Sequence, residues 1–168
     1  MDRFGEFYRE NKDRLYAYLL RMTGDVQASL DLVQESFLRY LRRYGEAKVE
    51  KSLLYAIARN GAMDLFRKKK MAVCDADEYG DSHTNPEQQL LDREALDDTI
   101  KAIATLKPPD RELIALLTAG DLTYQEIGRI LDISESNVKV RVHRARTKLR
   151  QTLASGMRKM PEKTEDGA

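Results

Sequence analysis

Hydrophobic positions recur at helical spacing along most of this chain, and no run alternates with period two for long enough to indicate a strand. We therefore expect an all-α protein. In the first half the apolar stripes predict three helices that share a core: residues 4–22, 26–44 and 52–69. Gly24 is the expected C-terminal cap of the first helix, and Asp25 and Ser52 are the expected N-caps of the next two. The positions expected to form the core stripe of the second helix are Leu30, Val33, Phe37, Tyr40 or Leu41, and Tyr44.

A stretch without apolar period separates this half from the rest of the chain. It carries a glycine, a proline and several acids, which is typical of a flexible linker. The helical pattern resumes over residues 87–106 and stops at two prolines, after which Asp110 is expected to cap a helix that reaches residue 117. The expected organisation is two small helical domains, a linker and a disordered tail: residues 1–70, 89–153, 71–88 and 154–168.

The most informative pattern lies in residues 122–149, which predict two helices joined by a very short turn. Thr123 and Glu126 have the spacing of a capping box at the start of the first of these helices. Asp132 tolerates the left-handed backbone that such a turn requires, and Ser134 is a good N-cap for the second helix. Apolar residues then recur at spacings of four, three and four to form a buried seam: Val138, Val142, Ala145 and Leu149.

The side of this last helix that faces away from the seam combines small, polar and basic residues. Lys and Arg neutralise phosphates, Asn and Arg form paired hydrogen bonds with base edges, and valine can contact a thymine methyl group. The two helices therefore match a helix-turn-helix unit with residues 134–150 as recognition helix. The alternative is an ordinary helical hairpin with a solvated charged face. The candidate DNA-binding residues are Ser136, Asn137, Lys139, Val140, Arg141, His143, Arg144, Arg146 and Lys148.

Composition excludes several classes of protein. Hydrophobic residues make up 42% of the 168 residues, which suffices for a core, yet no run is long enough to span a membrane. The N-terminus is charged rather than signal-like, so we expect a cytoplasmic protein. The net charge of +1 sums basic and acidic patches of opposite sign, so it says little about partners.

No set of residues predicts catalysis or metal binding. Cys74 is the single cysteine and the two histidines, His83 and His143, lie far apart, which argues against a disulfide framework or a zinc site. No glycine-rich phosphate loop and no paired nucleophile and base are found. We expect a protein that is not an enzyme and has no catalytic residues, metal or cofactor.

Two further blocks give the chain a family resemblance: DLVQESFLRYLRRY at residues 31–44 and SLLYAIARNGAMDLFRKKK at residues 52–70. Together with the helix-turn-helix, they resemble bacterial RNA polymerase sigma factors of the extracytoplasmic-function type. The first block is similar to region 2.2 of that family, the second to regions 2.3 and 2.4, and the helix-turn-helix to region 4.2. The resemblance covers about residues 3 to 153.

The resemblance implies a sigma factor that binds core RNA polymerase and directs promoter-specific initiation of transcription. Residues 134–150 would read the −35 element, and the segment 45–70 would read the −10 element. It also implies an anti-sigma factor as a partner. The −10 contacts implied are Lys48, Lys51, Arg59, Asn60, Asp64, Arg67 and Lys68. The residues implied to bind core polymerase are Asp31, Leu32, Gln34, Glu35 and Leu38.

Plainer interpretations stay open beside this one. The −10 residues are also what a solvated helix face and a surface loop would contain, and the polymerase set is what an ordinary helix surface would contain. A stand-alone helix-turn-helix repressor or activator is the second hypothesis for the whole chain. A third is an interaction protein that binds polymerase or another partner without reading DNA. The blocks at 31–44 and 52–70 favour the sigma factor, because a reader of duplex DNA alone does not need them.

Overall fold

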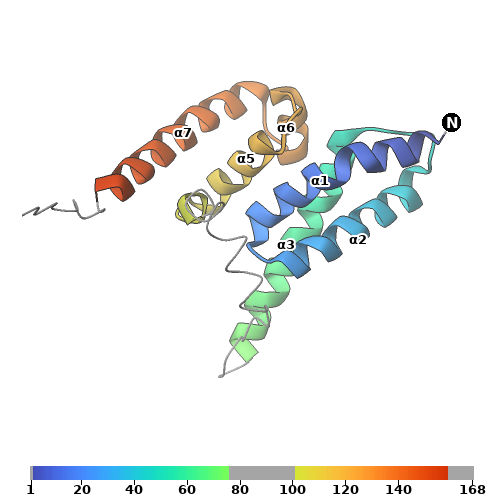
Figure 1. Cartoon of the computed structure of the whole chain (residues 1–168), viewed down its shortest axis with the longest axis horizontal. Helices are drawn as coiled ribbons and strands as arrows, with labels where there is room; N and C mark the ends of the chain where they lie inside the picture. Colours follow the sequence, from blue (N-terminus) through green and yellow to red (C-terminus); the bar gives the residue numbers. More distant parts are fainter. Residues whose placement is uncertain (1, 76–100, 159–168) are drawn as a thin grey trace, which may run out of the picture.

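The computed structural model describes residues 2–75 and 101–158, with side chains for residues 2–72 and 101–155. The helices, drawn in Figure 1, are α1 (Arg3–Thr23), α2 (Val26–Tyr44), α3 (Lys51–Asp75), α5 (Pro108–Ala119), α6 (Tyr124–Leu131) and α7 (Glu135–Arg158). Residues 101–104 are also helical, and within these ranges no residue is in a strand. The prediction of an all-α chain is therefore confirmed.

The boundary between α1 and α2 follows the capping residues predicted from the sequence. Gly24 ends α1 with φ at 66°, and its N–H donates to the carbonyl of Leu20 at 2.8 Å. A side chain at this position would be strained, because L-residues rarely adopt this left-handed backbone. Asp25 then caps α2 by accepting a hydrogen bond from the N–H of Ala28 at 3.0 Å.

Two predicted N-caps are wrong. Helix α3 already begins at Lys51, so Ser52 lies inside it, and its hydroxyl donates to the carboxylate of Glu50 at 2.9 Å. Helix α5 begins at Pro108 after Lys107, which makes no side-chain cap. Proline needs no N–H in the first helical turn and therefore starts this helix. Asp110 lies in that first turn rather than before it.

Three other sequence expectations also need correction. Leu30 was expected in the core of α2, but 46% of its surface is exposed. Helix α3 extends to Asp75, so the first five residues of the expected linker, 71–75, are helical, and Cys74 is one of them. The remainder of the expected linker, most of the helix expected at 87–106 and the end of the tail lie outside the described residues. The tail was expected to be disordered from residue 154, but residues 154–158 belong to α7.

The helix-turn-helix is confirmed in detail. Thr123 Oγ1 accepts from the N–H of Glu126 at 3.1 Å, and the Glu126 carboxylate accepts from the N–H of Thr123 at 2.7 Å. Asp132 adopts a left-handed backbone with φ at 56°. Ser134 Oγ accepts from the N–H of Asn137 at 3.1 Å at the start of α7. The turn passes so close to Gly128 that a Cβ there would lie 2.7 Å from the carbonyl oxygen of Ile133.

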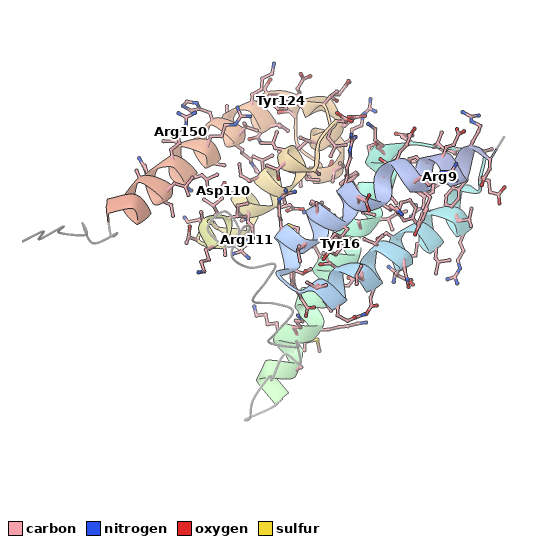
Figure 2. All side chains as sticks on the ribbon, in the orientation of Figure 1. Arg9, Tyr16, Asp110, Arg111, Tyr124 and Arg150 are labelled. Carbon is pink, nitrogen blue, oxygen red and sulfur yellow. The ribbon has the colours of Figure 1, made fainter. Side chains whose placement is uncertain are left out.

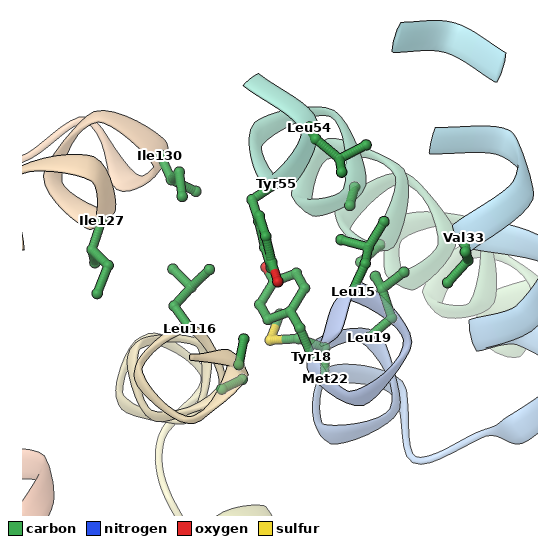
Figure 3. Packing of buried hydrophobic residues seen from close by; sticks show 14 of the residues in the cluster. Leu15, Tyr18, Leu19, Met22, Val33, Leu54, Tyr55, Leu116, Ile127 and Ile130 are labelled. Carbon is green, nitrogen blue, oxygen red and sulfur yellow. The ribbon is translucent and has the colours of Figure 1, made fainter. Parts of the chain in front are cut away.

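The two halves of the chain share one hydrophobic core, which the sequence did not predict. Helix α1 packs on α5, and α3 packs on α6. Figure 3 shows the tyrosine pair of the first half opposite aliphatic side chains of the second half. The labelled residues that meet there are Tyr18, Tyr55, Leu116, Ile127 and Ile130. A smaller core beneath α7 contains Ile103, Leu106, Ile114 and Ala145.

Candidate nucleic-acid and polymerase interfaces

Helix α7 has a buried side and a basic exposed side. Its seam residues Val138, Val142 and Ala145 are buried, as predicted. On the other side Val140 is 48% exposed and lies among basic residues. Water is an unfavourable environment for an apolar side chain. A thymine methyl group would provide a favourable contact. The exposed candidates on this helix are Ser136, Asn137, Lys139, Val140, His143, Arg144, Arg146 and Lys148, and Arg141 is half-buried.

Two lysines of this helix already have acidic partners. Lys139 lies 3.8 Å from the carboxylate of Glu135, one turn earlier, and Lys148 lies 2.8 Å from the carboxylate of Asp110 on α5. Arg144 and Arg146, in contrast, have no acid within ion-pair distance in the part of the chain that the structure describes. Among the candidate residues of α7, these two exposed guanidinium groups are therefore available to an external phosphate or base edge.

The connector before α3 is held from beneath by Tyr40. The Tyr40 hydroxyl donates to the carbonyl of Lys48 at 3.0 Å and accepts from the N–H of Glu50 at 2.9 Å. Burial raises the pKa of Tyr40, so this hydroxyl keeps its proton. The ammonium of Lys48 lies 5.2 Å from the centre of the Tyr44 ring and 3.8 Å from the carboxylate of Glu50. The loop is thus a fixed surface with an exposed cation.

The −10 candidates on α3 fall into two groups. Asn60, Arg67 and Lys68 are exposed, and Arg67 forms an ion pair with Asp64, which lies one turn earlier. Lys51 and Arg59 instead face the second half of the chain. Lys51 Nζ donates to the carbonyl of Asp121 at 3.2 Å. Arg59 forms an ion pair with the carboxylate of Glu112 on α5. The structure therefore does not bring all seven candidates to one open face.

Helix α2 presents a mixed apolar and acidic surface. Asp31, Gln34 and Leu38 are exposed, and Glu35 pairs with Arg39 at 2.7 Å. Leu32, which the resemblance placed in the polymerase-binding set, is half-buried and packs against the core. A Cβ added at Gly61 would lie only 3.1 Å from Leu32 Cδ2, so this leucine fills the seam between α2 and α3.

Sequence reasoning missed one residue of this surface. Leu30 lies four positions before Gln34 and eight before Leu38, so all three project from the same side of α2. It was assigned to the core because it lies at the edge of the apolar stripe, about 20° around the helix axis from buried Phe37 and about 40° from exposed Gln34. Leu30 and Leu38, at 46% and 48% exposure, are exposed apolar residues of this surface, which also carries Asp31.

A helix-turn-helix with a buried seam and a basic outward face is the architecture of proteins that read DNA in the major groove. Comparison with known proteins agrees. Residues 7–71 match the family described as Sigma-70 region 2, and residues 96–149 match Sigma-70, region 4. The chain is 31% identical over 157 residues to ECF RNA polymerase sigma factor SigM of Bacillus subtilis, covering 90% of this chain and 96% of that protein. It is 32% identical over 167 residues to SigW of the same organism, covering 90% and 89%.

Solved structures show the same fold. The sigma factor RpoE of Bartonella quintana, crystallised with the anti-sigma factor NepR, aligns with a TM-score of 0.74 at 22% identity, covering 92% of this chain and 98% of that one. CnrH, solved with the cytosolic domain of CnrY, aligns with a TM-score of 0.66 at 21% identity, covering 90% and 88%. The chain belongs to the extracytoplasmic-function RNA polymerase sigma factors, the ECF group of the sigma-70 family. Among the described residues no helix is long and apolar enough to cross a membrane.

Proposed function

We propose that this sigma factor reads the −35 element with the outward face of α7. The observation that supports this most strongly is the division of one helix into a buried seam and an exposed face with unpaired arginines. Arg144 suits a base edge or a phosphate, and Val140 suits a thymine methyl group. Lys139 suits phosphate, which positions the protein without specifying sequence. The remaining members of the proposed −35 surface are Ser136, Asn137, Arg141, His143, Arg146 and Lys148.

The first domain would read the −10 element. Asn60, Arg67 and Lys68 are the exposed residues that support this assignment, and Lys48 would contact the backbone from the connector held by Tyr40. An unpaired base requires a preformed surface that compensates for lost stacking, and a fixed connector provides one. In this proposal residues 1–70 and 89–153 are the two functional domains.

Helix α2 would bind core RNA polymerase through its exposed side. Leu30 and Leu38 provide apolar contact, and Asp31, Gln34 and Glu35 provide polar contacts at the rim. Mixed acidic and apolar character fits a protein partner better than it fits nucleic acid, because carboxylates repel phosphates. Leu32 would support this surface from beneath rather than bind the polymerase itself.

The structures of similar proteins suggest a further protein partner. Two similar proteins were solved with the anti-sigma factor NepR and with the cytosolic domain of CnrY, so we expect an inhibitor of this kind for the present chain. The chain would act in the cytoplasm and would not itself be an enzyme. It would supply promoter recognition to the polymerase, which carries out the chemistry.

Co-purification tests the proposal against the alternative of a stand-alone DNA-binding regulator. The tagged full chain is mixed with purified bacterial core RNA polymerase and passed over a size-exclusion column. A sigma factor elutes with the polymerase, and the Leu38→Glu variant does so to a smaller extent. A chain that binds duplex DNA but never elutes with the polymerase would favour the stand-alone regulator.

A further inference from the structure

Arg59 joins the two domains through a largely buried ion pair. Its guanidinium meets the carboxylate of Glu112, with Nη2 and Oε2 3.5 Å apart in the longer of two contacts. The Glu112 side chain is only 8% exposed, and that of Arg59 is 29% exposed. Removing one partner from such a pair is strongly destabilising, because it leaves an uncompensated buried charge. Because Arg59 lies on α3 and Glu112 on α5, the ion pair exists only while the two domains are packed together.

A second polar contact lies at the edge of the same interface. Asp121 has a left-handed backbone with φ at 62°, directly after α5. Its carboxylate pairs with Arg14 of α1, and its carbonyl accepts from Lys51 of α3 at 3.2 Å. One residue of the second domain thus holds two cations of the first. These contacts are exposed, so each is weak and sensitive to salt.

The interface also contains polar atoms that find no partner. The Tyr18 hydroxyl and Nη1 of Arg21 are buried without a hydrogen bond in the described structure. Burial raises the pKa of Tyr18 and lowers that of Arg21, as expected where water is excluded from a polar group. Unpaired buried polar atoms are rare in permanent cores. The Tyr18 hydroxyl, which faces the second domain, would regain water if the domains separated, and this reduces the free energy needed to open the interface.

We propose that this interface is a self-masking latch, in which Glu112 and Asp121 of the second domain hold Arg59 and Lys51 away from nucleic acid. The proposal rests on the −10 role that the family resemblance implies for Arg59 and Lys51. The carboxylate of Glu112 pairs with the guanidinium of Arg59, which a phosphate would otherwise bind. The carboxylate and the phosphate therefore compete for the same cation. Access of a phosphate to Arg59 therefore requires the domains to separate, whereas Lys51, whose contact is exposed, is held only weakly.

The latch has consequences for affinity. A ligand that binds only the open form has its apparent affinity reduced by the fraction of open molecules. Any partner that separates the domains thereby exposes the masked cations. Asn60, Arg67 and Lys68 are exposed in the closed form, so they can make the first contact with a strand before the latch opens.

The test uses the full chain with Glu112→Gln and a matched control, Asp110→Asn. Both residues lie at the start of α5, and both pair with a cation, but Asp110 pairs within its own domain, with Lys148. Each substitution removes one negative charge from the same helix. Asp121→Asn serves as a second latch variant, and asparagine tolerates the left-handed backbone there. Circular dichroism confirms that each variant is folded.

Domain separation is measured by energy transfer between dyes on cysteines that replace Arg9 and Arg150, in a Cys74→Ser background. Both arginines are exposed and lie on different domains, as Figure 2 shows. Glu112→Gln is expected to lower the transfer efficiency, and Asp110→Asn is expected to leave it unchanged. If transfer in both latch variants matches that of the wild type, the latch is refuted.

Masking is measured separately, by fluorescence anisotropy of a 20-nucleotide oligothymidylate with the unlabelled proteins. Relative to the wild type, Glu112→Gln is expected to bind this strand about fivefold more tightly. In an Arg59→Gln background this gain should disappear. Asp110→Asn frees only Lys148 and is expected to give a smaller gain. If the domains open without any gain in binding, the masking is refuted, and Arg59 is removed from the −10 residues that the resemblance implies. That outcome would leave the −35 and polymerase assignments standing.

Discussion

The rings of Tyr18 and Tyr55 meet edge to face, with centroids 5.4 Å apart and planes inclined by 62°. Tyr18 comes from α1 and Tyr55 from α3, and both lie where the second domain packs against the first. Edge-to-face pairs stabilise a core beyond the area they bury. The two hydroxyls, however, place polar atoms in an apolar contact, and this leads to two predictions.

The first prediction concerns the Tyr18 hydroxyl, which is buried without a partner. Tyr18→Phe should leave the free energy of unfolding unchanged or raise it by up to about 1 kcal/mol, because it removes an unsatisfied polar group. Tyr40→Phe is the control, since its hydroxyl makes two hydrogen bonds to the backbone. The control should destabilise the protein by about 1–2 kcal/mol. Urea unfolding measures both, and an equal loss in the two variants would contradict the prediction.

The second prediction concerns alkaline pH. Burial raises the pKa of Tyr55 to about 12 from an ordinary value of 10. Because the folded pKa lies above the unfolded one, the stability contributed by neutral Tyr55 is complete below pH 10 and is lost as pH rises toward 12. At pH 11 the wild type should have lost about 1.4 kcal/mol of this contribution, and Tyr55→Phe should not. Urea unfolding of both proteins at pH 9 and pH 11 measures the difference, and a gap between them that stays constant would contradict it.

Several caps and turns were predictable from local signals. Thr123 and Glu126 form their capping box three residues apart, and Gly24 and Asp132 adopt the backbone that their residue types favour. A cap was mispredicted where two local signals lay close together in the sequence. At Asp110 the preceding prolines took the first helical positions, so the aspartate became part of the first turn instead of the cap.

The contact between domains could not be predicted from periodicity. Arg59 and Lys51 were assigned to DNA because they are basic and lie near a family motif, but a helical pattern does not reveal what a distant acid will contact. Glu112 lies 53 residues away from Arg59 in the sequence. Tyr55 is buried for a similar reason, because α3 is covered on one side by α1 and α2 and on another by α6. A single apolar stripe describes only one of these contacts.

The third prediction tests the exposed surface of α2. Leu38→Gln should change the free energy of unfolding by less than about 0.5 kcal/mol, because the side chain is half exposed in the free protein. It should nevertheless weaken binding to core polymerase, where this leucine would be buried. Val33→Ala is the control: Val33 lies in the core, so its loss should lower stability without removing a polymerase contact. Unfolding by urea and titration of labelled chain with core polymerase separate the two effects. Unchanged polymerase affinity in Leu38→Gln would exclude this surface.

The fourth prediction separates two cations of α7. Arg144→Ala should weaken binding to a selected −35 duplex by about 1–3 kcal/mol and relax the preference at one base pair. Lys139→Ala should weaken binding to all sequences alike and lower the salt slope by about one. Selection of duplexes from a random pool with each full-length protein, followed by affinity measurements across a salt series, distinguishes these behaviours. If both variants select and bind like the wild type, α7 does not read the −35 element.

The central claim is that the chain directs core RNA polymerase to promoters, and transcription in a purified system tests it most directly. Core polymerase, the full chain and a library of genomic fragments from the same bacterium are combined, and the 5′ ends of the transcripts are sequenced. We predict start sites at a small set of fragments that share sequence near −10 and −35, with transcription from them reduced in the Arg144→Ala and Leu38→Gln variants. If core polymerase yields the same transcripts with and without the chain, while the chain still binds duplex DNA, it is a stand-alone regulator and the account is wrong.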